Sequence, residues 1–376
     1  MIPILYPSTT RNVADFGAIG RLAECISCKI TEDLYGTYEL ELQYPTNGRY
    51  AKDLLGDGII EAVTAFRPMG PSSGTTEIGA VAKRVQLFDI RRRVIADDII
   101  TLTCHHISYR LNNYIVNGIS NVGTRALSNA ANYIFSNAVP TLVSGAVFYP
   151  FTFRDKWVEN RTAAFESVAT KSVRSFLTDS WYSIRTEYGV EVQFNNWDVE
   201  IVSRMGKDEG YEVRLGKNFA RGEYDKDETE TFNALVPYWV REGQGKVVCN
   251  PLLVQPTTPI TPVKAIVKDF TNDFENQPTA AELKTYAQAY LDNNTPWIPH
   301  ETTHVEIYPR DKFGQFPYKV KPELAIGDTL TVFWADADVI GTKMRIVSAV
   351  YDSLAEEYET LELGDIQNGY VLTGEW

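Results

Sequence analysis

The sequence lacks the features of a membrane protein, a disulfide-stabilised fold or a nucleic-acid-binding protein. Its 376 residues include only four cysteines, too few for a disulfide scaffold of this length. No apolar run approaches the roughly 18 residues of a membrane span, and the N-terminus has no secretory-signal pattern. The net charge of −13 disfavours general binding of DNA or RNA, because affinity for phosphate comes from clustered Lys and Arg. We therefore expect the chain to be synthesised and folded in a cytosol.

The composition favours strands and turns over long helices. There are 21 Tyr and 17 Phe, and the chain is broken by 25 Gly and 18 Pro. The length predicts two to four domains, and the apolar fraction of 44% is enough for a packed core. We expect an α+β protein that is mostly β.

The first hundred residues are predicted to form a small antiparallel barrel or sandwich. In the segment 38–44, Tyr and Leu alternate with Glu and Gln, which is the period of a half-buried strand. Further strands are expected over the ranges 22–30, 59–66, 78–90 and 99–104.

The pattern then changes. Apolar residues at helical spacing follow Thr124, a candidate N-cap, up to Ala138, and a second helix is expected after Asn160. Two alternating runs on either side of Asn195 and Asn196 predict a tight hairpin, because Asn tolerates positive φ. Residues 108–204 therefore form a predicted α+β unit.

Four prolines in the segment 250–262 predict a stiff connector or edge segment. Thr279 and Glu282 have capping-box spacing at the start of a predicted helix. The rest of the chain is again rich in strands, with runs expected at 304–308, 329–334, 344–351 and 358–363.

The sequence motifs that could bind a metal or phosphate, or support catalysis, are weak. Cys25 and Cys28, with a His pair at 300 and 304, supply zinc-type ligands, but the two pairs are far apart and residues three apart on a strand face opposite ways. His105 and His106 face opposite ways for the same reason. The segment 210–218 departs from a phosphate loop in glycine spacing and has Asn where Ser or Thr is needed. We expect no cofactor, no metal and no catalytic constellation.

Charge is unevenly distributed. From Glu323 to Trp376 there are eleven carboxylates and two bases, a net charge of −9. This acid-rich end is typical of a solvated surface. The one basic run, Arg91, Arg92 and Arg93, is either a solvated turn or a contact with an acidic neighbouring subunit.

Several segments, in this order, resemble a known family. They are CKITEDLYGTYELELQYP, ADDIITLTCHHISYRL, NRTAAFESVATKSVRSFL, YGVEVQFNNWDVEIVSRMGKDEGYEVRLGKNFARGEYDKDETETFNALVPYW and AIGDTLTVFW followed by MRIVSAVYDSLAEEYETLELGD. The family is that of phage minor structural, or prophage tail endopeptidase-like, proteins. It corresponds to the baseplate hub at a phage tail tip and to the N-terminal hub part of tail-associated lysins.

The resemblance implies a four-part protomer. A first hub barrel takes residues 1–107 and 205–240 and is interrupted by the inserted α+β domain, residues 108–204. A connector domain with a helix, 241–303, precedes a second, similar barrel, 304–376. Three protomers would form a ring of six barrels around a channel.

The resemblance further implies a virion structural protein at the tail tip that attaches to the distal tail ring, closes the tail tube and passes DNA. Further partners would be the tape-measure protein, receptor-binding or tail fibre proteins and the host cell surface. Channel-lining candidates are Asp336, Asp338, Glu356, Glu357 and Glu359.

Two alternatives remain open. A tail-associated cell-wall hydrolase, a peptidoglycan endopeptidase, is suggested by the family label, although lysins carry a long C-terminal extension beyond the point where this sequence stops. A host-surface saccharide-binding module would present aromatic platforms, for example at Trp181, Trp197 or Trp297.

Overall fold

The computed structural model divides into two compact units, Met1–Glu223 with Thr303–Trp376 (unit 1) and Tyr224–Thr302 (unit 2). The structure describes residues 1–10, 17–34, 36–64, 85–119, 124–140, 151–157, 161–165, 167–179, 182–214, 219–241, 243, 245–274, 276–294, 296–297, 300–307, 324–337 and 339–365. The fold is mostly β with short helices, as the composition predicts. None of the helices in these ranges is both long enough and apolar enough to span a membrane.

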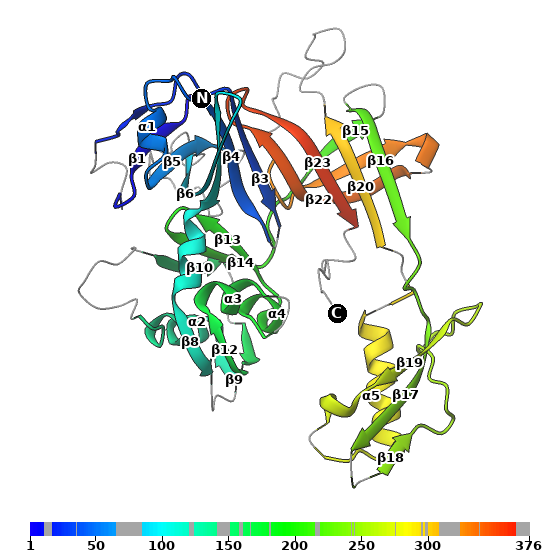
Figure 1. Ribbon diagram of the computed structural model, residues 1–376. Helices are drawn as coiled ribbons and strands as arrows, with labels where there is room; N and C mark the ends of the chain where they lie inside the picture. Colours follow the sequence, from blue (N-terminus) through cyan, green and yellow to red (C-terminus); the bar gives the residue numbers. More distant parts are fainter. Residues whose placement is uncertain are drawn as a thin grey trace. The chain divides into compact units, whose positions relative to one another are not determined.

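The first part of unit 1 is a curled antiparallel sheet, which we call the first lobe (Figure 1). Alternation sets its core, since the four apolar side chains of the segment 38–44 are all buried. The sheet order is β3-β4-β7-β6-β5-β1-β2. Its elements are β1 (Ile4–Pro7), β2 (Gly20–Arg21), β3 (Ser27–Asp33), β4 (Tyr38–Pro45), α1 (Ala51–Leu54), β5 (Gly58–Val63), β6 (Val85–Ala96) and β7 (Ile99–His106).

The last part of the chain continues the same sheet as a second lobe. Its strands are β15 (Asp208–Arg214), β16 (Phe219–Asp227), β20 (His300–Ile307), β21 (Thr329–Trp334), β22 (Val339–Asp352) and β23 (Glu357–Asp365), with the 3₁₀ turn η4 (Ala335–Ala337). The long strand β22 joins the lobes. One end of it pairs with β21, and the other end pairs with β3 from Ser348 opposite Asp33 to Asp352 opposite Lys29.

Residues 205–240 were expected in the first barrel, but the strands of this range pair elsewhere. β15 runs parallel to β21 in the second lobe, and β17 (Ala234–Arg241) pairs inside unit 2. The physical reason is that period-two alternation defines which face of a strand is buried and not which strand lies beside it. Unit 2 correspondingly begins at Tyr224.

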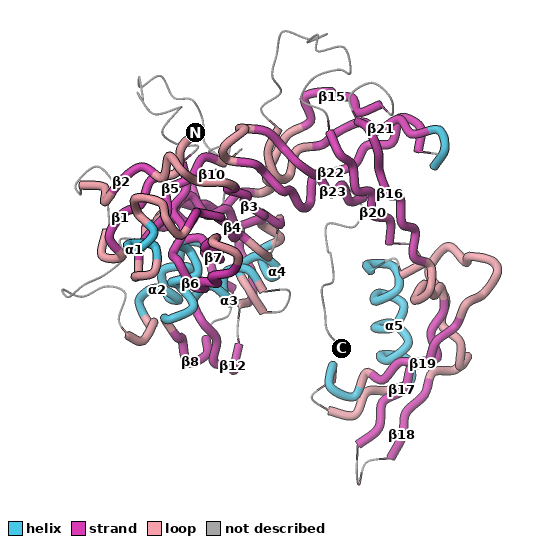
Figure 2. The backbone as a smooth tube through the Cα atoms, turned by 45° about the horizontal axis from the view of Figure 1, so that its top comes forward, coloured by secondary structure: helices cyan, strands magenta, loops and turns pink. Residues whose placement is uncertain are grey.

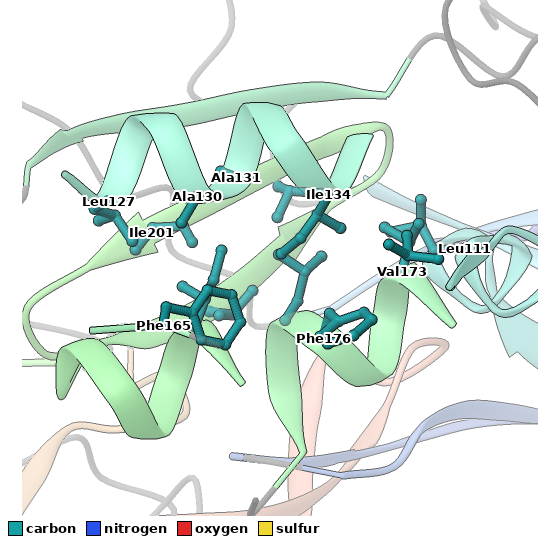
Figure 3. Packing of buried hydrophobic residues seen from close by; sticks show 14 of the residues in the cluster. Leu111, Leu127, Ala130, Ala131, Ile134, Phe165, Val173, Phe176 and Ile201 are labelled. Carbon is teal, nitrogen blue, oxygen red and sulfur yellow. The ribbon is translucent and has the colours of Figure 1, made fainter. Parts of the chain in front are cut away.

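The segment between β7 and β15 folds on its own apolar core (Figure 3). Leu127, Ala130, Ala131 and Ile134 lie on one face of α2 and pack toward Phe176. The elements are η2 (Ile107–Asn113), β8 (Ile115–Ile119), β9 (Thr124–Ala126), α2 (Leu127–Ser136), β10 (Thr152–Trp157), β11 (Thr162–Ala164), β12 (Ser167–Ser172), α3 (Val173–Thr178), α4 (Ile184–Tyr188), β13 (Glu191–Asn195) and β14 (Asp198–Val202).

The helix predicted after Asn160 was wrong. The segment forms two short strands, β11 and β12, before α3 begins after Ser172, whose side chain accepts a hydrogen bond from the Ser175 amide. β12 contains Val168 and Thr170, and such β-branched residues favour extended backbone when partner strands are present. The predicted hairpin of β13 and β14 is confirmed, with Asn196 at a φ of +51°.

Unit 2 is a three-stranded sheet with one helix packed against it (Figure 2). Its elements are β17, β18 (Gly245–Val248), β19 (Ala265–Asp269), the turn η3 (Thr271–Asp273) and α5 (Ala280–Asn294). The predicted capping box is confirmed, because Glu282 accepts from the Thr279 amide and Thr279 Oγ1 accepts from the Glu282 amide. Leu283, Ala287 and Leu291 of α5 pack on Leu235 and Trp239 of β17.

Candidate assembly surfaces

A buried ion pair fixes the inserted segment to the second lobe. Arg345 of β22 donates from Nη1 and Nη2 to the two carboxylate oxygens of Glu191 on β13, each at 2.6 Å. The same guanidinium donates to the carbonyl oxygens of Gly327 at 3.0 Å and Met205 at 2.8 Å. A planar guanidinium that donates to a carboxylate and also to backbone carbonyl oxygens holds these acceptors in one fixed geometry. The orientation of β13 relative to β22 is therefore set by this residue.

Two glycines meet beside this ion pair. A Cβ on Gly206 would lie 2.0 Å from the carbonyl carbon of Gly327, and both residues have positive φ. Only glycine allows two backbones to approach so closely in this conformation. The contact brings the chain that leaves β14 directly against the chain that enters β21.

A second junction joins the inserted segment to the first lobe. Asn196, in the turn between β13 and β14, donates to the Val85 carbonyl at 2.9 Å and accepts from the Leu87 amide at 2.8 Å. Gln86 accepts from the Asn196 amide, and its Oε1 also lies 3.1 Å from Nε2 of His106. The predicted turn residue, Asn196, therefore has a second role: its side chain hydrogen-bonds to the backbone at the start of β6.

His106 is buried in this junction, as expected for a structural histidine. Its Nδ1 accepts from the Ser108 amide and lies 2.9 Å from Ser108 Oγ, so the Nε2 nitrogen carries the proton toward Gln86. The ring stacks on Tyr38 at a centroid distance of 4.2 Å. Burial, with a smaller effect of the Arg174 charge, holds the pKa of His106 well below its usual value. His105, on the other face of β7, lies 3.4 Å from Glu39.

Three of the acidic candidates, Glu356, Glu357 and Glu359, lie at the β22–β23 turn, whereas Asp336 lies before the other end of β22. Asp336 in η4 and Glu357 are exposed. Glu356 is exposed too and pairs with the N-terminal ammonium at 3.1 Å, and Glu359 pairs with Lys29 at 2.7 Å. Asp338 lies outside the described residues.

One row of the large sheet brings the acidic and the basic candidates onto the same face. Directly paired residues point to the same side of a sheet. From β23 to β6, the row runs through Glu357, Asp352, Lys29, Glu41, Thr103 and Arg92. In the sequence these charges stand in separate segments. Glu41 alternates with the buried leucines of β4, which predicts its exposed side, but nothing in the sequence indicates which strands lie beside β4.

The three arginines of the basic run differ in whether they are bonded within the chain or are accessible to a neighbouring molecule. Arg93 is tied to its own chain, because it pairs with Asp57 at 3.0 Å and donates to the Gly56 carbonyl at 2.6 Å. Arg91 is the extra residue of a β-bulge between Ile90 and Arg92 and lies 3.5 Å from Asp89. Arg92 is exposed. Arg91 and Arg92 are therefore the two that can reach a neighbouring molecule.

The two cysteines of the candidate metal motif lie within hydrogen-bonding contact of each other, although their spacing predicted opposite faces of a strand. Cys25 and Cys28 are free thiols, and the described residues contain no group of three or more potential metal ligands. The histidines at 300 and 304 lie in β20. Residues 210–214 of the suspected phosphate loop belong to strand β15, and the remainder lies outside the described ranges.

The aromatic platforms of the saccharide alternative are partly covered. Trp197 packs beside the core residues of the first lobe, with the Arg110 guanidinium 5.5 Å from its ring. Trp297 packs against the unit 2 core. Trp181 lies outside the described residues.

No protein-family model and no curated protein sequence matches the chain. Chains of solved structures do match its fold. Prophage tail protein gp18 from Listeria monocytogenes EGD-e aligns with a TM-score of 0.55 at 12% identity, over 97% of this chain and 94% of that chain. A tail protein from Neisseria meningitidis MC58 aligns with a TM-score of 0.53 at 11% identity, over 97% and 96%.

A third structure is the 43 kDa tail protein of prophage MuSo2 from Shewanella oneidensis. It aligns with a TM-score of 0.50 at 11% identity, over 97% of this chain and 98% of that chain. The chain therefore has the fold of solved phage-type tail proteins across nearly its whole length. The predicted resemblance to a tail protein family is confirmed at the level of the fold.

Proposed function

We propose that the chain is a structural subunit of a bacteriophage or prophage tail tip, and that it forms a homotrimeric baseplate hub. The observation that carries the proposal is the alignment with three tail proteins over 94% or more of each of those chains. A match of that extent includes both lobes, the inserted segment and unit 2. The same likeness supports a location in the virion tail, and the tail tip is part of the proposal.

The two-lobed sheet supports the trimer. Each chain contributes two curled lobes joined through β22 and β3, so three chains would present six lobes. Six lobes match a sixfold tail tube, and the distal tail ring is the expected partner above the hub. We propose that the hub closes the tube and forms the channel for DNA, with tape-measure and receptor-binding or fibre proteins as further partners.

We further propose a four-part division of the protomer that follows the strand pairing. The first lobe takes β1 to β7, the inserted domain takes residues 108–204, unit 2 is the connector, and the second lobe takes the remaining strands of the large sheet. This assigns β15 to the second lobe and β17 to the connector.

The acidic candidates are proposed to face the channel. A channel wall that carries Asp336, Asp338, Glu356, Glu357 and Glu359 would repel phosphate, and DNA would pass without adhering. Glu41 joins this set because it lies on the same sheet row as Glu357. Arg91 and Arg92 are proposed as contacts to an acidic surface of the neighbouring subunit.

The test is the absolute mass in solution, measured by light scattering behind a sizing column over a range of concentrations. The expected result is a species of three times 42.4 kDa. Imaging of that species should show a ring with six lobes. A monomer at every concentration, also in the presence of the distal tail ring protein, would contradict the hub.

A further inference from the structure

Two free cysteines meet at the edge of the first-lobe core. Cys28 is the second residue of β3 and is fully buried in that core, whereas Cys25 stands in the turn that leads into the strand and is partly exposed. Their thiols lie within hydrogen-bonding contact of each other. A continuous strand would point residues three apart to opposite sides, so the contact depends on the turn.

Backbone hydrogen bonds hold Cys25 in this position. Its amide donates to the Leu22 carbonyl at 3.0 Å, and its thiol donates to the Ser27 carbonyl at 3.2 Å. The next amide, that of Ile26, donates to the Gln43 carbonyl of β4 at 2.8 Å. The chain on both sides of Cys25 is therefore bonded to the lobe, which keeps its sulfur at the edge of the core.

The other cysteine of this core is too far away to be the partner of Cys28. Cys104 lies on β7, and β4 stands between β7 and β3. Along β4, Leu42 lies opposite Cys28 and Leu40 lies opposite Cys104, so the two cysteines are also offset in register. Neighbouring strands are about 4.8 Å apart, which separates the two backbones by about 10 Å, beyond the roughly 7 Å that a disulfide spans. In the described part of the first lobe, Cys25 is thus the sulfur that Cys28 can reach.

Ser353, which follows β22 and is fully buried, is the polar neighbour of Cys28. Its amide donates to the Cys28 carbonyl at 2.8 Å, and its hydroxyl oxygen accepts from the Val63 amide at 3.0 Å. The hydroxyl proton is thereby available to the Cys28 sulfur. The hydrogen bond from the Cys28 thiol to Cys25, together with burial, raises the pKa of Cys28 well above its usual value. Cys28 is therefore held as a thiol while Cys25 is reduced.

We propose that Cys25 and Cys28 form a reversible disulfide site, which a low-molecular-weight disulfide such as glutathione disulfide oxidises. Cys25 reacts first because it is the exposed member of the pair. Its sulfur attacks one sulfur of the oxidant, whose S–S bond breaks, and one glutathione leaves as a thiol. Cys28 then gives its proton to solvent and attacks the Cys25 sulfur, and the second glutathione leaves and takes up a proton. Two cysteine thiols are oxidised to one disulfide, and one glutathione disulfide is reduced to two thiols.

The disulfide would tie the turn 22–25 covalently to β3. This strand joins the two lobes by pairing with β22, and the Cys28 carbonyl itself accepts from the Ser353 amide. A tail protein that leaves a reducing cytosol in a released particle enters an oxidising medium, so the pair would be reduced during assembly and oxidised afterwards. This timing rests on the proposed function, whereas the disulfide itself does not.

The experiment treats the folded full chain with excess glutathione disulfide at about pH 8, where thiol–disulfide exchange proceeds. Remaining thiols are alkylated in denaturant, and the tryptic peptides are mapped by mass spectrometry. Both cysteines fall in one peptide, Leu22–Lys29, because trypsin cleaves after Arg21 and Lys29. Cys104 falls in another peptide and is the matched buried thiol. Circular dichroism and thermal unfolding verify that the variants Cys25→Ser and Cys28→Ser are folded.

In the wild type, we expect the peptide Leu22–Lys29 to lose two hydrogen atoms and to regain them with dithiothreitol, while Cys104 stays a thiol. Cys28→Ser should stop at a mixed disulfide between Cys25 and glutathione, and Cys25→Ser should not react. Two thiols retained in the wild-type peptide would overturn the site. A mixed disulfide that accumulates in the wild type as it does in Cys28→Ser would overturn it equally.

The covalent tie has its own readout. The Ile26 amide should exchange its hydrogen roughly tenfold more slowly in the oxidised chain than in the reduced chain. Unchanged exchange at Ile26 would overturn the tie between the turn and β3. None of these measurements needs an oligomer, so a monomeric chain that oxidises as expected would contradict the hub and leave the disulfide site intact.

Discussion

Arg345 and Glu191, 154 positions apart in the chain, are joined by two hydrogen bonds of 2.6 Å between side chains that are both buried. The pair crosses from the second lobe to the inserted segment, and Arg345 also satisfies two backbone carbonyls. Burying a charge is costly unless it is paired and hydrogen-bonded, so each member depends on the other.

Replacement of Arg345 by Met should therefore destabilise unit 1 by about 3–5 kcal/mol, because it leaves the Glu191 carboxylate buried without a cation. The measurement is the free energy of unfolding in urea. The double variant with Glu191→Leu removes both charges and should recover most of the loss. A double variant as unstable as Arg345→Met alone would show that the carbonyl contacts of Arg345, and not its ion pair, stabilise the junction.

Gly206 and Gly210 allow a matched test of the close backbone contact, because both have a φ of +71°. At Gly206 a Cβ would lie 2.0 Å from the Gly327 backbone, whereas at Gly210 it would meet nothing within 4 Å. Gly210→Ala should cost only the strain of a left-handed residue, about 1–2 kcal/mol. Gly206→Ala adds a backbone clash and should lose more than about 4 kcal/mol or fail to fold. Equal decreases in Tm for the two variants would show that the close contact between Gly206 and Gly327 does not limit which residue can stand at position 206.

The local structure could be predicted from the sequence because its causes are local. Alternation over the segment 38–44 identified β4 and its buried face, Asn196 identified a hairpin turn, and Thr279 with Glu282 identified the start of α5. Each signal lies within a few residues of the structure it specifies.

The pairing of distant segments could not be predicted in this way. The segment 344–351 was predicted as a strand, but its residue pattern does not indicate that β3 is its neighbour. Arg345 stands between Met344 and Ile346, a position that alternation assigns to the solvent-facing side, so its burial could not be predicted from the sequence. Its partner Glu191 is equally unremarkable in sequence, so the junction emerges only when both strands are placed. The prediction of a helix after Asn160 was wrong for a related reason. The segment forms strands β11 and β12, which are stabilised by pairing with the distant strands β9 and β8.

Asn196 should contribute to stability beyond its turn conformation. Asn196→Gly keeps a residue that tolerates the φ of +51° but removes the side-chain hydrogen bonds to Val85 and Leu87. Two lost hydrogen bonds at a partly buried edge should cost about 1–3 kcal/mol. The direct measurement is hydrogen exchange at the Leu87 amide, which should become at least tenfold faster. Unchanged exchange at Leu87 would mean that the amide is protected without Asn196.

His106 should make the stability of unit 1 depend on pH in a defined direction. In the folded chain its pKa lies well below the usual 6.5, chiefly because of burial. The neutral ring accepts a hydrogen bond from the Ser108 amide at Nδ1, an interaction that a protonated nitrogen cannot make. The unfolded chain takes up the proton as the pH falls below about 6.5, and the folded chain does not. The contribution of His106 to stability is therefore fully present above pH 6.5 and is lost as the pH falls.

The measurement is the free energy of unfolding of the wild type and of His106→Gln between pH 8 and pH 5. Gln cannot be protonated in this range, so the pH dependence that remains in the variant belongs to the other groups, which the two proteins share. The difference between wild type and variant should be constant above pH 7. It should then fall by about 1.4 kcal/mol per pH unit below the unfolded pKa, the slope for one proton. Parallel profiles down to pH 5 would show that His106 is protonated equally in the folded and unfolded chains, against its burial between Tyr38 and Gln86.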